Sequence, residues 1–267
     1  MTESVADIDK QLVRRSFEQA AGHYNQFTSL QRDIGNRLMA NYIGAELVVD
    51  NMVDIGCGTG YLTNKLIQAY PSSNLYAVDI SFAMLQQTKQ QVATSQYLNL
   101  GCADADKLPF AASSMDVVCS NLAFQWCSNL EKTFAQAAAI LKENGQFIFA
   151  TFGPQTLKEL KYAWGFADNS VHINQFSSVE EISAALSVSG FANISIYTED
   201  LVLSYKTPHA LMRDLKGMGA HNINTSRNRG LTGVKSFQRM INAYQSLLEN
   251  DCLPATFQAV YVKAQMR

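Results

Sequence analysis

VDIGCGTG, at residues 53–60, reads as a buried strand that runs into a glycine-rich turn and then into a helix. The three glycines of this turn, Gly56, Gly58 and Gly60, allow positive φ angles and let the backbone approach a ligand closely. The helix that follows, from about Tyr61, offers unpaired backbone N–H groups at its start. The stretch therefore predicts an α/β fold with a ligand site at the turn.

The next predicted strand, NLYAVD at residues 74–79, ends in Asp79. Because the carboxyl ends of parallel strands meet at one edge of a sheet, Asp79 is expected beside the glycine turn. A carboxylate there accepts both hydroxyls of a ribose, and the absence of a nearby arginine argues against a 2′-phosphate. A dinucleotide turn of the form Gly-x-Gly-x-x-Gly would require glycine where Tyr61 stands. These residues predict a ribose-containing ligand other than a dinucleotide.

The Gly56-x-Gly58-x-Gly60 spacing, with Asp54 ahead of it, resembles motif I of the class I methyltransferases. The resemblance implies that this loop wraps the amino-acid part of S-adenosylmethionine. Ile80 and Met84, which follow the second predicted strand, are expected among the cofactor-binding residues.

Two later stretches fall at the same predicted edge of the sheet. CADAD, at residues 102–106, resembles the motif in which an acid side chain binds the adenine amino group and a backbone N–H meets a ring nitrogen; Asp104 and Ala105 are the candidates. The alternative, that Asp104 and Asp106 are only turn-forming acids, stays open. SNLAFQW, at residues 120–126, would line the sulfonium and the methyl acceptor, with Asn121 and Leu122 on the cofactor side.

The composition predicts a globular cytoplasmic protein. The chain has 267 residues, of which 47% are hydrophobic. It contains no apolar run of the ~18 to 20 residues that a membrane helix needs, and its first residues do not form a signal peptide. The five cysteines lack a C-x-x-C spacing and the four histidines are scattered, so no metal site is expected.

Basic residues are concentrated in one segment. Residues 201–240 carry a net charge of +6, while the rest of the chain carries −8. Such asymmetry predicts an anionic partner near this segment, although a solvated basic face without a partner would show the same pattern.

The alternation of strands and helices between residues 49 and 153 predicts a Rossmann-like α/β sheet, mostly parallel with an antiparallel last strand. We expect N-terminal lid helices at 1–45, a methyltransferase domain at 46–200 and 253–267, and an inserted, partly helical basic cap at 201–252. The expected helices are 7–21, 29–42, 60–70, 81–94, 129–142, 154–166, 178–189, 207–217 and 235–249. The expected strands end at residue 55 or span 74–79, 97–102, 115–121, 145–153, 193–198 and 257–264, with a further strand inside the cap.

Three runs sharpen the resemblance to a particular family: FxxAAxxY at 17–24, NLAxQWC at 121–127 and LMRxLKGMGA at 211–220. They are similar to the malonyl-acyl-carrier-protein O-methyltransferases of biotin synthesis over nearly the full chain. The resemblance implies methylation of the free carboxylate of a malonyl thioester on acyl carrier protein. S-adenosylmethionine would be the cofactor, S-adenosylhomocysteine the product, and no metal would take part.

A malonyl carboxylate, with a pKa near ~4, is ionised at neutral pH and needs no general base. We therefore expect no indispensable catalytic side chain. Tyr24, Gln125 and Trp126 are candidates for pocket walls and orienting hydrogen bonds, with simple core packing as the alternative.

Arg213, Lys216 and Arg227 are candidates for the substrate carboxylate, the phosphopantetheine phosphate or the acidic face of the carrier protein. Most of the basic residues are expected at the carrier-protein dock, where their charge would raise the association rate. The carrier protein would be a transient partner of a monomeric enzyme that binds neither nucleic acid nor membrane.

Three other interpretations fit parts of the sequence. A methyltransferase of the same fold acting on a small free acid or a quinone precursor would share every sheet motif. A non-catalytic module that binds S-adenosylmethionine or NAD would share the glycine turn. An RNA methyltransferase would use the basic segment, but aromatic residues are sparse among its charges.

Overall fold

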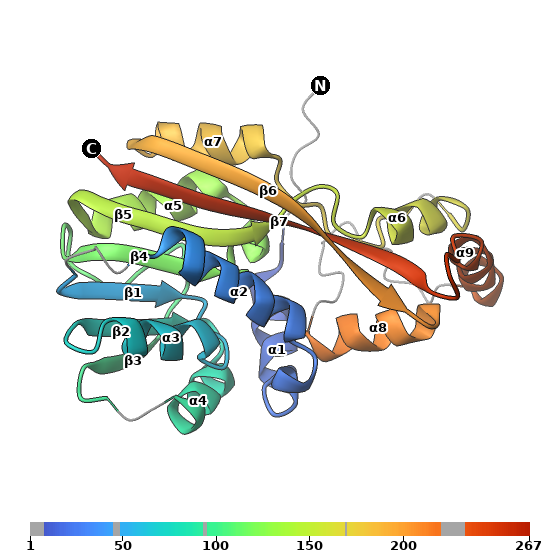
Figure 1. Cartoon of the computed structure of the whole chain (residues 1–267), viewed down its shortest axis with the longest axis horizontal. Coiled ribbons are helices and arrows are strands. Elements are labelled where there is room, and N and C mark those ends of the chain that lie inside the picture. The colour runs from blue at the N-terminus through green and yellow to red at the C-terminus, as the bar shows by residue number, and fades with distance from the viewer. Residues whose placement is uncertain (1–7, 45–48, 93–94, 169, 220–232) are drawn as a thin grey trace.

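In the computed structural model, which describes residues 8–44, 49–92, 95–168, 170–219 and 233–267, seven strands form one sheet in the order β3-β2-β1-β4-β5-β7-β6 (Figure 1). The pairs from β3 to β5 are parallel, and β7 runs antiparallel to both β5 and β6. The predicted α/β sheet with an antiparallel last strand is confirmed. The strands are β1 (Asn51–Ile55), β2 (Asn74–Asp79), β3 (Leu98–Cys102), β4 (Met115–Asn121), β5 (Leu141–Phe152), β6 (Phe191–Tyr205) and β7 (Leu253–Met266).

Helices cover both faces of this sheet. One face packs against α2 (Ser29–Tyr42) and α3 (Tyr61–Ala69), and the other against α5 (Leu130–Ile140) and α7 (Val179–Val188). The second face holds a cluster of fully buried aromatic rings from η2 (Phe124–Trp126), α5 and β5. A buried layer of side chains on each face of the sheet therefore holds in position the edge at which the predicted site residues lie. The remaining helices of this part of the chain are α1 (Lys10–Ala20), η1 (Tyr24–Gln26) and α4 (Phe82–Gln91).

Strands β6 and β7 are much longer than the segments 193–198 and 257–264 predicted from the sequence. After a register shift between Ala192 and Ser195 they pair continuously to the end, where Leu201 lies opposite Phe257 and Tyr205 opposite Leu253. The strand expected inside the cap is thus the second half of β6. Its side chains alternate between half-buried and exposed, because β6 is an edge strand and only one of its faces packs on the protein.

The far halves of β6 and β7 form a two-stranded ribbon that extends to α6 (Lys158–Gly165), α8 (Pro208–Gly217) and α9 (Val234–Gln245) (Figure 1). Helix α6 starts four residues later than predicted from Pro154. The reason is a turn that is fastened to β7: Leu157, at φ 57°, donates its N–H to the carbonyl of Thr256 at 2.6 Å. Helix α8 begins as its sequence suggests, since the Thr207 side chain caps it and Pro208 occupies its first turn.

Candidate functional site

The three glycines of the turn between β1 and α3 all have positive φ angles, but they serve different purposes. A Cβ on Gly56 would lie 2.2 Å from the Cβ of Ala123, and one on Gly60 would lie 2.5 Å from Val92. A Cβ on Gly58 would have its nearest described neighbour 4.0 Å away. Gly56 and Gly60 are therefore required by packing, whereas the backbone at Gly58 borders open space that a ligand can fill.

Asp79 is bound to this turn, as the sequence predicts. Its carboxylate accepts the N–H of Gly58 at 2.9 Å and the N–H of Ser81 at 2.8 Å. Burial raises the pKa of Asp79 to about 6, even though these hydrogen bonds favour the ionised form. The carboxylate is thus held in one orientation at the sheet edge, with acceptor capacity left for hydroxyl groups.

A cavity of about 90 Å³, the turn cavity, lies between the turn, the ends of β2 to β4 and helix α1. It brings together nine of the predicted cofactor-binding residues. Gly60 faces α4 instead, and Asp54 lines a neighbouring cavity. The nine residues in the wall of the turn cavity are Gly56, Gly58, Asp79, Ile80, Met84, Asp104, Ala105, Asn121 and Leu122.

Lys10 of α1 enters this wall and was not predicted from the sequence. Its ammonium lies 2.5 Å from both Asp104 and Asp106, and Asp106 also accepts the hydroxyl of Thr133 at 2.5 Å. One oxygen of Asp104 additionally accepts the N–H of Asp106 at 2.9 Å. Asp104 therefore both shapes its turn and borders the cavity. No local sequence signal could identify Lys10, because its partners lie more than ninety residues away.

A second small cavity, of about 50 Å³, lies on the other side of the glycine turn, and we call it the Asp54 cavity. One oxygen of Asp54 accepts the hydroxyl of Thr63 at 2.6 Å, while Oδ1 is buried and has no hydrogen-bond partner in the described chain. Burial raises the pKa of Asp54 to about 7. A cationic donor such as the α-ammonium group of S-adenosylmethionine would satisfy both the orphaned oxygen and the buried charge, so these residues fit that cofactor.

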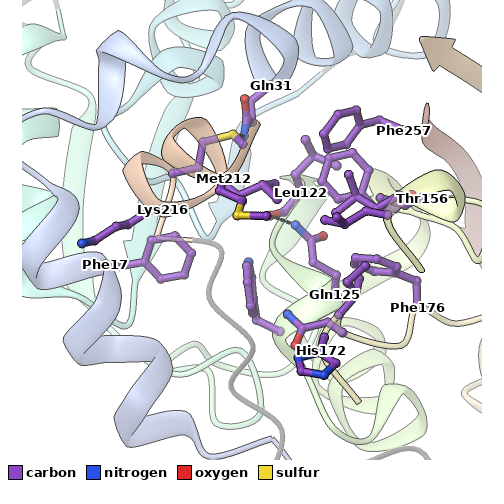
Figure 2. Close-up of a pocket in the computed structure, with 18 of the residues that line it drawn as sticks. Phe17, Gln31, Leu122, Gln125, Thr156, His172, Phe176, Met212, Lys216 and Phe257 are labelled. Atoms are coloured by element: carbon purple, nitrogen blue, oxygen red, sulfur yellow. Dashed lines mark hydrogen bonds between the residues drawn. The ribbon is translucent and has the colours of Figure 1, made fainter. Parts of the chain in front are cut away.

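A third cavity, of about 270 Å³, is called the large cavity here and has a wall made mainly of aromatic and aliphatic side chains (Figure 2). It shares four residues with the turn cavity, so the two spaces meet at one partition. Gln125 stands in its wall with both ends of its amide engaged: it donates to the Leu122 carbonyl at 2.6 Å and accepts from Thr151 at 3.2 Å. The four shared residues are Phe17, Tyr24, Leu122 and Trp126.

Tyr24 lines the turn cavity, the Asp54 cavity and the large cavity. Its ring and that of Trp126 each make an edge-on contact with Phe17, with centroids 6.2 and 5.5 Å apart. Burial, followed by the nearby charge of Asp79, raises the pKa of the Tyr24 hydroxyl, so this group stays protonated and can donate a hydrogen bond. Two of the three predicted pocket residues thus stand at the partition, and Gln125 stands beside it.

The basic candidates occupy different positions. Lys216 of α8 lines the large cavity, and Figure 2 shows its amine pointing away from Gln125. The side chain of Arg213 is 74% exposed and its nearest acid is Asp214 at 3.9 Å. Arg227 lies outside the described residues.

His172 is another residue of the large cavity that the sequence did not indicate. Its ring stacks on Trp164 with centroids 3.6 Å apart, and its Nε2 lies 2.7 Å from a carboxylate oxygen of Asp168. Within the described ranges no cluster of three or more histidine, cysteine or acidic side chains is arranged to hold a metal ion. No helix in the same ranges is long and apolar enough to cross a membrane.

Comparisons with known proteins agree with this geometry. Residues 53–149 match the model of the methyltransferase domain family. A malonyl-[acyl-carrier protein] O-methyltransferase of Nitrosospira multiformis is 40% identical, over 95% of this chain and 88% of that protein. Its counterpart from Gallionella capsiferriformans is 37% identical, over 95% and 90%. A biotin biosynthesis bifunctional protein BioHC of Teredinibacter turnerae is 34% identical, over 95% of this chain and 46% of that protein.

Solved structures share the fold at much lower identity. The YcgJ protein of Bacillus subtilis superposes with a TM-score of 0.60 at 16% identity, over 88% of this chain and 97% of that one. A phosphoethanolamine N-methyltransferase 2 of Haemonchus contortus, solved with S-adenosyl-L-methionine, gives 0.56 at 14% identity, over 94% and 57%. From the match to relatives across almost its whole length, the chain belongs to the malonyl-[acyl-carrier protein] O-methyltransferase family and is an S-adenosylmethionine-dependent methyltransferase.

Proposed function

We propose that this enzyme methylates the free carboxylate of a malonyl group carried on acyl carrier protein, giving the methyl ester at an early step of biotin synthesis. The observation that carries the proposal is the large apolar cavity next to the turn cavity, with Phe17, Tyr24, Leu122 and Trp126 as their common partition. The relatives described above carry the same activity in their names.

The cofactor would occupy the turn cavity and the Asp54 cavity. Asp79 would accept the two ribose hydroxyls, and Asp104 and Ala105 would meet the adenine edge, with Ile80 and Met84 against its ring. Asn121 and Leu122 would lie near the sulfonium. When bound, S-adenosylmethionine supplies a methyl group that passes to a carboxylate oxygen as the carbon–sulfur bond breaks and a carbon–oxygen bond forms.

The protein's contribution to this step is to orient and desolvate the acceptor. A malonyl carboxylate is already ionised at neutral pH, so no side chain has to remove a proton. Apolar walls weaken its hydration, and a fixed position close to the methyl group replaces a bimolecular encounter. Tyr24 and Trp126 would set that position, while Gln125 holds the Leu122 carbonyl in place. No single catalytic side chain is required.

The carrier protein would dock on the cap. We infer a division into lid helices at 1–45, the methyltransferase domain at 46–200 and 253–267, and the basic cap at 201–252. Arg213 is exposed on α8 and would meet the acidic carrier, while Lys216, in the wall of the large cavity, would meet the phosphopantetheine arm. We further infer a cytoplasmic monomer whose macromolecular partner is the carrier protein rather than a nucleic acid or a membrane.

The test is to incubate the enzyme with S-adenosylmethionine and malonyl-acyl carrier protein, malonyl-coenzyme A or free malonate, and to follow the mass gain of one methyl group. Arg213→Ala should raise the KM for the carrier substrate about two- to fivefold, and added salt should have the same effect. The control Lys89→Ala, an exposed lysine in the last turn of α4, should leave it unchanged.

Each alternative outcome is distinct. Methylation of free malonate alone would identify a small-acid methyltransferase. Binding of S-adenosylhomocysteine without methylation of any malonyl compound would refute the proposed substrate but would still support the assignment of the cofactor.

A further inference from the structure

The Asp54 cavity contains opposite charges that do not pair with one another. Asp54 enters it from β1, and Arg32 enters from α2. In the described chain no carboxylate lies within 4 Å of the Arg32 guanidinium, and its Nε is buried with no hydrogen-bond partner. An unpaired buried donor on a charged group costs free energy, so its presence points to a ligand that supplies the missing acceptor.

Arg32 is held in place without that acceptor. Its guanidinium carbon lies 5.4 Å from the centroid of the Tyr61 ring, and the Tyr61 hydroxyl donates to Asn36 of the same helix α2 at 2.8 Å. A cation–π contact attracts the guanidinium without using its N–H groups, which stay available for an anion. The cation is therefore positioned before any ligand arrives.

Three residues that line the same cavity carry unpaired acceptor atoms. The Oδ1 atoms of Asp54 and Asn121 and the Oε1 of Gln31 are all buried without a hydrogen-bond partner among the described residues. Three acceptors, one of them anionic, match the three donors of an ammonium group, whereas a guanidinium matches a carboxylate. An ammonium and a carboxylate side by side are the two ends of a zwitterionic α-amino acid.

We propose that Arg32 binds the α-carboxylate of S-adenosylmethionine, opposite Asp54 at the α-ammonium. The Asp54 cavity and the turn cavity share Tyr24, Gly56, Gly58 and Asn121. An amino-acid group bound in the Asp54 cavity can therefore be covalently continuous with an adenosyl group bound in the turn cavity. Helix α2 thus contributes a charged contact to cofactor recognition. The inference rests on the cofactor of the proposed function and is independent of its substrate.

The test uses ligands that lack parts of the amino acid. Calorimetry should show that Arg32→Met weakens S-adenosylhomocysteine about ten- to hundredfold, or about 1.4 to 2.8 kcal/mol. The affinity for 5′-methylthioadenosine, which lacks the whole amino-acid end, should stay within about twofold, as binding without the carboxylate requires. Wild-type enzyme should prefer S-adenosylmethionine to its decarboxylated analogue, and Arg32→Met should lose that preference.

Arg37→Met is the matched control, because Arg37 lies on the same helix but pairs with Asp33 and Glu199 at 3.0 and 2.8 Å. It should leave all four affinities unchanged. Arg32→Lys, which keeps the charge and loses the planar fork, should fall between wild type and Arg32→Met.

Equal weakening of S-adenosylhomocysteine and 5′-methylthioadenosine by Arg32→Met would assign Arg32 a purely structural role on Tyr61 and overturn the inference. So would an unchanged affinity for both ligands. If the wild-type enzyme bound no S-adenosylhomocysteine, the inference and the cofactor assignment would fail together. If the Arg32 effect appeared as expected but malonyl-acyl carrier protein were not methylated, only the proposed substrate would fail.

Discussion

The ion pairs of Lys10 should anchor α1 to the sheet edge, and Lys10→Met tests this. The Lys10 side chain is 25% exposed and that of Asp106 only 7%, whereas Asp104 is 35% exposed. A surface ion pair contributes about 0 to 1 kcal/mol to stability, and breaking a fully buried pair costs about 3 to 5 kcal/mol. The contribution of the Lys10–Asp106 pair should lie between these two values. The Lys10–Asp104 pair adds little to stability because solvent screens the charge of Asp104. We expect a loss of about 2 kcal/mol, or about 4 to 8 °C in Tm.

The pKa shifts define the pH range of this contribution. Burial opposes ionisation of Asp106, but the hydrogen bonds and charge of Lys10 outweigh it and lower the pKa of the carboxyl. Burial likewise opposes the charge on Lys10, and its two carboxylate partners outweigh it and raise the pKa of the amine. The stabilisation is thus complete between about pH 5 and 9, and is lost as the pH falls below the usual Asp value or rises through the raised Lys value.

Urea unfolding of wild type, Lys10→Met, Asp106→Asn and the double variant at pH 7 gives the coupling energy directly. Arg14→Met is the control, because Arg14 pairs with Glu18 on the same helix and its side chain is 58% exposed. That change should cost less than about 0.5 kcal/mol. A Lys10–Asp106 coupling below about 0.5 kcal/mol would refute the anchoring role.

Three further changes test the turn and its acids. Gly56→Ala should destabilise the protein by about 2 to 4 kcal/mol in urea unfolding, because φ is 71° and the new Cβ would meet Ala123. As a control, Gly22→Ala should change the free energy of unfolding by less than about 0.5 kcal/mol, because no described atom lies within 4 Å of the new Cβ. Asp54→Asn should stabilise the ligand-free protein by about 1 to 3 kcal/mol at pH 8 and by less at pH 5, because the cost of a raised carboxyl pKa grows as the pH rises from the usual Asp value to about 7 and is complete above that; equal gains at both pH values would contradict this. Calorimetry should show S-adenosylhomocysteine affinity falling as the pH drops below about 7 and more steeply below about 6, because both Asp54 and Asp79 must ionise to bind it; Asp79→Asn should remove the steeper part and keep the dependence that Asp54 causes.

Local sequence signals predicted the sheet and much of the site. The glycine turn and Asp79 could be placed because a parallel sheet brings the carboxyl ends of its strands to one edge whatever the rest of the chain does. The structure indeed brings Gly58 and Asp79 within a hydrogen bond of each other. Asp54 follows the same rule but faces a different cavity, because alternate residues of β1 point to opposite faces of the sheet.

Residues that act across long sequence distances were missed. Lys10 and Arg32 lie on the N-terminal helices, and their roles depend on how those helices pack on loops that come later in the chain. The full length of β6 was also missed, because Glu199 and Asp200 interrupt the apolar alternation that predicts a strand. An edge strand tolerates such residues, since one side of it meets water.

The long pairing of β6 with β7 has a mechanical consequence for helices α8 and α9. Both strands pass without a break from the sheet to the helices at the far end of the ribbon. Helices joined to a sheet through flexible loops could rotate about those loops. Here α8 and α9 are joined to the sheet by two paired strands, so they can move only as far as this ribbon bends or twists. Bending or twisting of the ribbon would therefore move Met212 and Lys216 of α8 and change the shape of the large cavity whose wall they form.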